Sequence, residues 1–249
     1  MINIKTSSEI KIMDMANKIV NVVLNEVGKK IAPGIRASEL NEVAEDVVKR
    51  LGAKPAFKGY NGYKYSICVS INDEIVHGLP ERNKIIKEGD IVSVDFGAYY
   101  NGYYGDAAKT FIVGEVSKEI EDFVRTAEDA FYAGVSQVKV GNRIGDISCA
   151  IQSLVESRGY GVVRDLVGHG IGTALHEDPP VPNYGRPGTG PDIINGMVLA
   201  IEPMITMGDF RVIYDKDGWT ARTYDGKLSA HFEYSVAVVD GSYYILGIN

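Results

Sequence analysis

Residues 91–110 read IVSVDFGAYYNGYYGDAAKT and place two acids within one short stretch. Asp95 closes an apolar run, and Asp106 follows later among glycines, tyrosines and alanines. The glycines at positions 97, 102 and 105 suit a tight hairpin whose backbone passes close to a neighbour. Taken alone, Asp95 is typical of a strand-end aspartate that caps a turn. On adjacent strands of one hairpin, however, the two acids lie close together, and such carboxylates do not both stay ionised without a cation.

Apolar residues at helical spacing predict a pair of helices on each side of this hairpin. The predicted helices cover about 6–28 and 38–51, and then about 118–138 and 146–158. A capping box, Thr6-Ser7-Ser8-Glu9, opens the first helix. Gly52 and Gly159 follow the shorter helices, where a C-cap glycine belongs.

Strand-like runs follow each helix pair, and one pattern within them recurs. The predicted strands are 65–71, 91–95 and 108–113, and then 197–201, 211–214, 219–224 and 234–239. GDIVSVD at 89–95 and GMVLAIE at 196–202 share a glycine, an apolar strand and a closing carboxylate. We therefore predict a single α+β domain over 1–249, built from pseudo-twofold repeats at about 5–116 and 117–246. Runs of helices followed by runs of strands place the helix pairs outside a largely antiparallel sheet.

The composition is that of an ordinary globular protein. The chain has 249 residues, 45% of them hydrophobic and 24% charged, which excludes disorder as its main state. A net charge of −7 argues against a general or sequence-specific nucleic-acid binder, although it leaves a local basic patch open. Cys68 and Cys149 form no CxxC pair, which fits a reducing compartment. No signal segment and no run of ~18 apolar residues is present, so we expect a cytoplasmic protein without a membrane partner.

Three of the four histidines lie in unusual settings. His169 and His176 belong to the glycine-rich stretch GHGIGTALHEDP at 168–179, and His77 lies in NDEIVHG. The glycines beside His169 are expected to leave that side chain uncovered. These settings leave a functional role and a surface or core role equally open. His231, in SAHFE, is interpreted as an ordinary strand residue.

Two further acids, Glu202 in AIEPM and Glu233 in HFEYS, lie in apolar or aromatic strands. An unpaired carboxylate there costs several kcal/mol. A lysine or arginine could pair with either acid, but the strand that carries Glu202 has no basic residue nearby. Together with Asp95 and Asp106 these acids carry four negative charges, which two divalent cations would neutralise. Four carboxylates with one imidazole suit Mn²⁺, Fe²⁺, Co²⁺ or Zn²⁺ held as a pair better than a structural zinc ion.

Over essentially the whole chain, to about Ile245, the sequence resembles the type I methionine aminopeptidases, the compact branch of the pita-bread metallopeptidases. The motifs that carry the resemblance include PAFKGYNGY at 55–63, CVSINDEIVHG at 68–78, SVDFGAYYNGYYGDAAKT at 93–110, GHGIGTALHEDP at 168–179, IEPM at 201–204 and DGWT at 217–220. The resemblance implies a pita-bread fold, in which two related halves surround one catalytic centre.

The resemblance also implies a ligand set for two divalent ions, with Co, Mn, Fe, Zn and Ni all possible. Asp95 resembles the bidentate ligand of one metal. Asp106 and Glu233 resemble the bridging carboxylates, while His169 and Glu202 resemble ligands of the other metal.

Seven residues match substrate positions of the family. His77 and His176 match the two non-ligand histidines around the substrate. Five residues fall where the family lines its methionine pocket: Tyr60, Tyr63, Cys68, Leu175 and Trp219. Position 175 is often aromatic in relatives, so leucine alters the shape of the pocket. His231 matches no functional position.

The implied reaction is metal-assisted hydrolysis that removes the N-terminal methionine from nascent proteins with small second residues. Glu202, His77 and His176 are the implied catalytic residues: Glu202 moves the proton, His176 stabilises the oxyanion and His77 holds the peptide. The family implies a monomer, and the reaction class makes the ribosome a candidate partner.

Two alternatives share the fold. Proline-specific peptidases usually carry an extra N-terminal domain, for which a first helix opening at Thr6 leaves no room. A non-catalytic binding domain would not need all five ligands.

Overall fold

The computed structural model describes residues 2–248, and this part of the chain holds four α-helices. They are α1 (Ser7–Gly28), α2 (Ala37–Arg50), α3 (Lys118–Val135) and α4 (Ile144–Ser157). The predicted capping box is confirmed, because Thr6 accepts from the backbone of Glu9 while the Glu9 side chain accepts from the backbone of Thr6. The third helix ends at Val135, short of the predicted residue 138. Within the described residues no helix combines the length and apolar character that crossing a membrane requires.

The main sheet runs in the order β1–β4–β5–β14–β9–β7–β8, with β2 on β4 and β15 on β14. Every pairing in it is antiparallel, as predicted. Its strands are β1 (Lys54–Pro55), β2 (Cys68–Ile71), β4 (Ile91–Tyr100), β5 (Tyr103–Ile112), β7 (Val167–Gly170), β8 (Glu177–Pro182), β9 (Val198–Ile201), β14 (Glu233–Val239) and β15 (Ser242–Ile245).

Two small antiparallel sheets flank the main one. The first has the order β13–β10–β6, and the second the order β11–β12–β3. Their strands are β3 (Glu74–Val76), β6 (Gly161–Val162), β10 (Met204–Thr206), β11 (Val212–Tyr214), β12 (Ala221–Thr223) and β13 (Ser229–His231), and a 3₁₀ turn, η1, spans Tyr60–Gly62.

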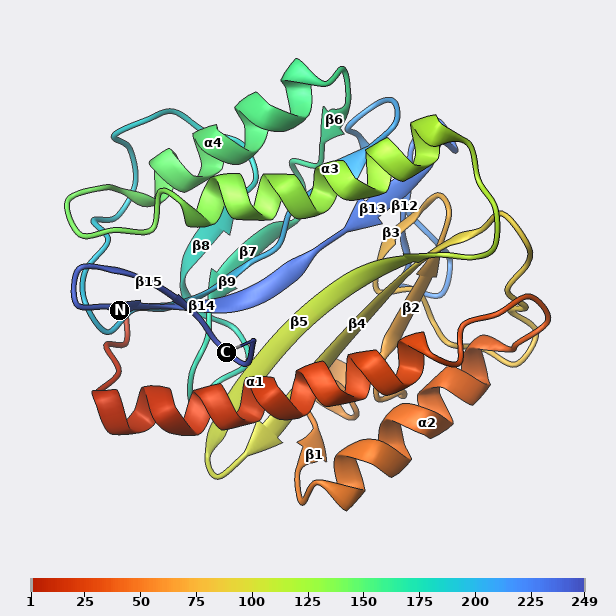
Figure 1. Ribbon diagram of the computed structural model, residues 1–249, viewed down its shortest axis with the longest axis horizontal. Helices are drawn as coiled ribbons and strands as arrows, with labels where there is room; N and C mark the ends of the chain where they lie inside the picture. The colour runs from red at the N-terminus through yellow and green to blue at the C-terminus, as the bar shows by residue number, and fades with distance from the viewer. Residues whose placement is uncertain (1, 249) are drawn as a thin grey trace.

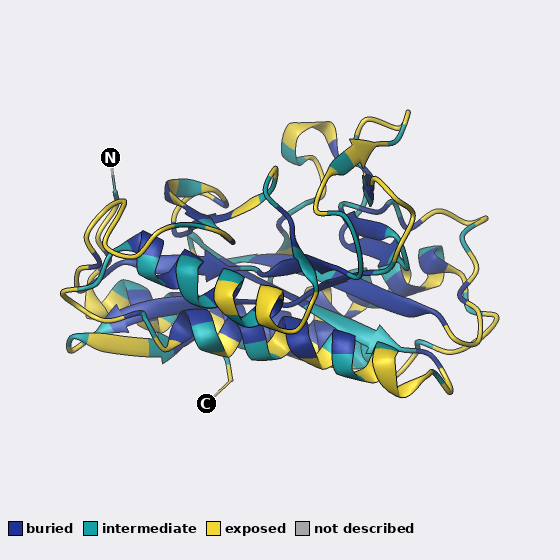
Figure 2. Ribbon diagram, turned by 90° about the horizontal axis from the view of Figure 1, so that it is seen from above, coloured by how far each residue is buried: buried dark blue, intermediate teal, exposed yellow. Residues whose placement is uncertain are grey.

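The helix pairs lie apart, with the long strands running between them (Figure 1). Helix α1 packs on β4 and β5, whereas α3 packs on β13, β14 and β9. Buried residues concentrate in the strands and on the helix faces turned toward them, and exposed residues lie on the outer helix faces and loops (Figure 2). Phe96 on β4 and Phe131 on α3 belong to one continuous core. The predicted α+β class is confirmed, and the pseudo-twofold repeat stays a prediction.

Several strand ends differ from those predicted. The hairpin strands β4 and β5 extend to the turn, because Tyr99 pairs with Tyr104 and Tyr100 with Tyr103. Asn101-Gly102 makes this turn with both φ values positive, which suits a two-residue hairpin connection. Glu233 opens β14, so the expectation that it lies in a strand is confirmed, whereas Glu202 directly follows β9 and the same expectation for Glu202 is wrong.

Candidate active site

The β4–β5 hairpin carries the first two acids on one face of the main sheet. Asp95 pairs with Ala108 and Asp106 pairs with Gly97, so the two acids are diagonal neighbours. Directly paired residues share a face, as do alternate residues along a strand. The predicted hairpin and the placement of its two acids are therefore confirmed.

The strand register brings three more candidate ligands onto that face. Glu233 opens β14 beside β5, and Ser235, two residues along, pairs with Ala200. Ala200 also pairs with His169 on β7, and Glu202 lies two residues beyond Ala200. Because side chains alternate along strands, all of these positions share the face of the two aspartates. The β4–β5 hairpin, β7, β14 and the end of β9 thus converge on one site.

The five candidate ligands form a cluster in which three buried carboxylate oxygens lack hydrogen-bond partners among the described residues. Ligand atoms of Asp106, His169 and Glu233 lie within 4.8 Å of one another. His169 Nε2 lies 3.6 Å from Glu202 Oε1. Among the described residues, Asp95 Oδ1, Asp106 Oδ1 and Glu233 Oε1 are buried without a hydrogen-bond partner. Because unpartnered buried carboxylates are costly, this donor set fits divalent cations.

Burial raises the pKa of all four carboxyls, and repulsion from neighbouring carboxylates adds to the increase at Asp95, Glu202 and Glu233. Burial raises the pKa of Asp106 to about 7. Burial, and then the charge of Asp106, raises the pKa of Glu202 and Glu233 well above the usual range. Burial and the charges of Asp106 and Glu202 do the same for the pKa of Asp95. Such a cluster needs either protons or cations to compensate its charge.

His169 presents a free ring nitrogen to this cluster. Its Nδ1–H donates to the carbonyl of Gly170 at 2.8 Å, which leaves the lone pair on Nε2, the nitrogen beside Glu202. Burial lowers the pKa of His169 to about 4, so the imidazole is neutral at pH 7. A neutral imidazole oriented by a backbone carbonyl is a typical metal ligand.

The glycines beside His169 do not leave it uncovered, and that expectation is wrong. His169 is only 9% exposed. A Cβ on Gly168 would lie 2.4 Å from the carbonyl oxygen of Ala200, and one on Gly170 would lie 2.2 Å from that of Asp178. The glycines therefore allow β7 to pack tightly against its neighbours and fix the position of the imidazole.

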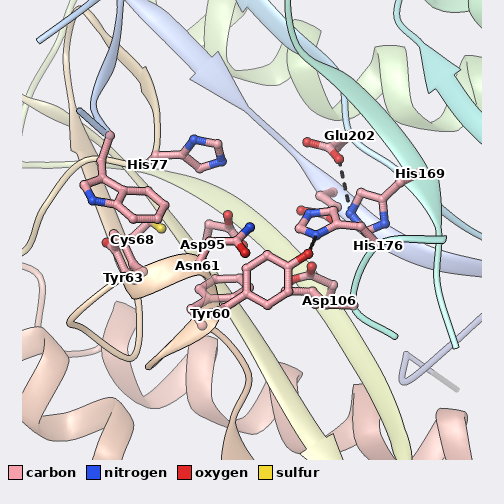
Figure 3. A pocket seen from close by; sticks show the side chains of 14 residues that line it. Tyr60, Asn61, Tyr63, Cys68, His77, Asp95, Asp106, His169, His176 and Glu202 are labelled. Atoms are coloured by element: carbon pink, nitrogen blue, oxygen red, sulfur yellow. Dashed lines mark hydrogen bonds and ion pairs between the residues drawn. The ribbon is translucent and has the colours of Figure 1, made fainter. Parts of the chain in front are cut away.

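The five candidate ligands line one part of a cavity. Mainly aromatic and apolar side chains line the rest of it. Tyr63 and Cys68 lie at one end, and His169 and Glu202 at the other (Figure 3). The Tyr63 and Trp219 rings meet edge to face at 5.0 Å. All twelve predicted site residues line this cavity, namely Tyr60, Tyr63, Cys68, His77, Asp95, Asp106, His169, Leu175, His176, Glu202, Trp219 and Glu233.

Two further residues, Phe57 and Asn61, line the same cavity and were not predicted. Both belong to the motif PAFKGYNGY, and Asn61 lies in the 3₁₀ turn with a positive φ of 47°. The motif was the signal for them, because a loop that supplies Tyr60 and Tyr63 also brings its intervening side chains to the cavity.

Tyr60 and His176 contact each other beside the candidate ligands. Tyr60 Oη lies 2.7 Å from His176 Nδ1, and the rings of His176 and His169 have centroids 4.3 Å apart. Burial lowers the pKa of His176. When the Tyr60 hydroxyl donates to Nδ1, the proton of the neutral ring is on Nε2, where it is available as a hydrogen-bond donor.

His77 faces the cavity from a strained backbone. Its φ of 59° lies in the left-handed region, which residues other than glycine seldom adopt. Burial lowers the pKa of His77 to about 4. Strain of this kind is concentrated at functional sites, where the surrounding structure enforces it.

His231 is the strand residue that the sequence predicts, because it ends β13, and it also lies close to the cluster. It is 1% exposed, and its Nε2 lies 3.6 Å from Glu202 Oε2 and 3.8 Å from Glu233 Oε2. The pairing of His231 with Met204 on β10 brings this side chain to the two acids. This pairing was not visible from the sequence.

The sequence profile of metallopeptidase family M24 matches residues 11–240. The chain belongs to metallopeptidase family M24. The methionine aminopeptidase of Clostridium acetobutylicum is 51% identical over 99% of this chain and 98% of its own length. The crystal structure of a methionine aminopeptidase from Thermotoga maritima is 52% identical and has a TM-score of 0.98, with 100% of both chains covered. A prolidase from Pyrococcus furiosus is 25% identical with a TM-score of 0.79, over 99% of this chain and 65% of its own.

Membership of family M24 makes the chain a metal-dependent peptidase, and therefore a hydrolase. The predicted family resemblance and the pita-bread fold are confirmed by these similarities. The M24 peptidases use metal ions, and the buried carboxylates and imidazole described above are the candidate ligands for them in this chain.

Proposed function

We propose that this M24 peptidase removes the N-terminal methionine from nascent proteins and peptides with the help of two divalent cations. One observation carries the proposal: an aromatic, sulfur-containing pocket directly adjoins four buried or half-buried carboxylates and a neutral imidazole. The similarity to two methionine aminopeptidases at 51% and 52% identity supports it.

In this proposal the five clustered residues hold both cations. Asp95, Asp106, His169, Glu202 and Glu233 would hold them, the four carboxylates supplying negative charge and His169 a neutral nitrogen. Co, Mn, Fe, Zn and Ni all suit such ligands, so availability in the cell selects the metal. The bound cations would supply Lewis-acid activation of the attacking water and of the scissile carbonyl.

Three side chains act during hydrolysis: one transfers a proton, one stabilises the oxyanion and one holds the substrate. Glu202 accepts the proton of the attacking water and passes it to the leaving amine. His176, held by Tyr60, donates a hydrogen bond from Nε2 to the oxygen that becomes negative in the transition state. His77 holds the peptide group of the substrate.

The apolar end of the cavity selects the first residue of the substrate. Five side chains surround the methionine: Tyr60, Tyr63, Cys68, Leu175 and Trp219. A flexible thioether packs well against aromatic rings, which supports methionine over branched or charged residues. We further propose that the second residue is small, that the enzyme acts as a cytoplasmic monomer, and that it meets its substrates at the ribosome.

The test is release of the first residue from the tripeptide Met-Ala-Ser, compared with Leu-Ala-Ser and Ala-Pro, in the presence of Mn²⁺ or Co²⁺. The proposal predicts that methionine is released fastest and that chelation stops the reaction. Preferential cleavage of Ala-Pro would instead assign the proline-specific activity of the same fold. Folded protein that binds metal but cleaves none of the three peptides would be a binding domain.

A further inference from the structure

His231 is a buried imidazole to which the mechanism above gives no role. Neither of its ring nitrogens has a hydrogen-bond partner within the described part of the chain. An unsatisfied buried polar group costs about 1–3 kcal/mol. An apolar side chain at the end of β13 would avoid that cost, so the imidazole needs an explanation.

The ring nitrogen Nε2 faces two proposed metal ligands at once. It lies 3.6 Å from Glu202 Oε2 and 3.8 Å from Glu233 Oε2. The other oxygen of Glu202, Oε1, lies 3.6 Å from His169 Nε2. The Glu202 carboxylate therefore lies between two imidazoles, one on each oxygen. A shift of roughly half an ångström would bring Nε2 of His231 to hydrogen-bond distance.

The backbone of His231 is fixed by a threonine. Its N–H donates to Thr110 Oγ1 at 3.0 Å, and the Thr110 hydroxyl donates to its carbonyl at 2.8 Å. Ser93 Oγ lies 2.8 Å from the same hydroxyl. These bonds join β13 to the β4–β5 hairpin, so the imidazole is held against the two glutamates.

The imidazole lies behind the glutamates and not in the cavity. Glu202 and Glu233 line the cavity with the other ten predicted residues, and His231 is outside this lining. Carboxylates that bind metals normally have hydrogen bonds from a second layer of residues. When Glu202 and Glu233 are ionised to bind a cation, the oxygens nearest to Nε2 are acceptors only, so an Nε2 that carries a proton is the form that stabilises them.

We propose that His231 is a positioning residue whose Nε2–H donates to Glu202 and Glu233 and so orients both carboxylates for cation binding. This inference rests on the proposed metal site. His231 then affects metal affinity and the placement of Glu202, but it does not contact the substrate.

The first test compares three substitutions by isothermal titration of Mn²⁺ into chelator-treated protein. His231→Leu keeps the bulk and removes the donor, and we expect metal affinity to fall about 10–100-fold. His231→Gln keeps an N–H donor and should recover most of that affinity. Phe131→Leu is the matched control, because it disturbs the same core next to Phe232 without touching the cluster. It should lower Tm by several degrees and leave metal affinity unchanged.

The outcomes separate this inference from the function it rests on. Metal affinity of His231→Leu equal to that of the parent protein overturns the inference, as does a Gln variant as weak as the Leu variant. If the parent protein binds no divalent cation, the proposed function fails and this inference fails with it.

The second test needs no substitution and so does not depend on the folding of a variant. The ¹⁵N chemical shifts of the imidazoles are measured in the Zn²⁺-loaded parent protein, where only four histidines require assignment. We expect Nε2 of His231 to carry its proton. A proton on Nδ1 alone, or a zinc-bonded Nε2, would rule out the donor role.

Discussion

At the scale of single residues, the site is governed by four carboxyls that fold into a space without counter-charges of their own. Asp95, Asp106 and Glu233 each bury an oxygen that lacks a partner among the described residues. Burial raises the pKa of Asp106 to about 7, and burial together with neighbouring carboxylates raises the pKa values of Asp95, Glu202 and Glu233 well above their usual range. The chain thus places charge where only protons or cations can compensate it.

Metal binding should therefore release protons at pH 7. Carboxyls with raised pKa values hold protons before the cations arrive, whereas the proposed ligand His169 is already neutral because its pKa is about 4. We expect on the order of one proton or more to be released per protein, and affinity for Mn²⁺ to increase between about pH 6 and 8. Titration calorimetry in buffers of different ionisation enthalpy measures both. Proton uptake on binding would show that the sign of these shifts is wrong.

Glu202→Gln should abolish hydrolysis while the fold is retained. The amide has nearly the same shape but neither accepts the proton of water nor neutralises a cation, so we expect kcat to fall about 10²–10⁴-fold and metal affinity to weaken. Steady-state release of methionine measures the first effect, and the circular dichroism spectrum checks the fold. Glu26→Gln is the control, since Glu26 is an exposed partner of Lys29. Activity of the Glu202 variant within a few-fold of the parent would assign the base to another residue.

At the scale of elements, the sequence predicted helices better than strands. Thr6 and Glu9 mark the first helix start, and periodic apolar residues define each helix body, because both signals are local. The hairpin strands were predicted too short, since their tyrosine- and glycine-rich ends do not alternate. The His231 contact could not be predicted, because it depends on pairing between β10 and β13.

The candidate site was predictable because its residues occur in long, specific motifs. All twelve predicted site residues line one cavity, although they come from separate loops and strands. The conformation around His169 was harder to predict from the sequence. Gly168 and Gly170 are needed there because backbone atoms of neighbouring strands occupy the space that a Cβ would fill. Sequence patterns identified the residues that line the cavity. How neighbouring strands bury these residues depends on the strand register, which the sequence patterns do not give.

An ion pair between the N-terminal segment and β8 should stabilise the fold. Lys5 Nζ lies 2.6 Å from Glu177 Oε2, and the two side chains are 5% and 4% exposed. Lys5→Met leaves the carboxylate buried and unpaired, so we expect a loss of about 3–5 kcal/mol in the free energy of unfolding. Urea denaturation measures it. Lys29→Met, which breaks the exposed pair with Glu26, should cost under about 1 kcal/mol. If both substitutions lower the free energy of unfolding equally, burial does not strengthen the ion pair between Lys5 and Glu177.

At the scale of the whole molecule, the proposed cations connect the two helix-pair halves. Asp95 and Asp106 come from the β4–β5 hairpin packed on α1, while His169 and Glu233 come from β7 and β14, and Glu202 from the end of β9, in the other half of the strand order. If the five residues bind two cations, the formal charge moves from −7 to −3, since four positive charges are added. Metal binding is then also a contribution to folding.

Metal removal should accordingly lower thermal stability. At a free metal concentration 100 times Kd, each bound site adds about 2.7 kcal/mol, and a protein of this size gains about 2–4 °C in Tm for each kcal/mol. Differential scanning calorimetry with and without a chelator measures the change, and re-addition of Mn²⁺ should reverse it. Identical Tm values in both conditions would mean that the cations do not bind this folded site.

The central claim is that two cations bound by the five clustered residues support release of the N-terminal methionine. A single titration tests both the binding and the reaction. Mn²⁺ is added under anaerobic conditions to chelator-treated enzyme while bound metal and methionine released from Met-Ala-Ser are measured in the same samples. The account predicts no release without metal, binding of two ions per chain, and release that rises as those ions bind. Undiminished release from the metal-free enzyme, or two bound ions with no release of methionine, would contradict it.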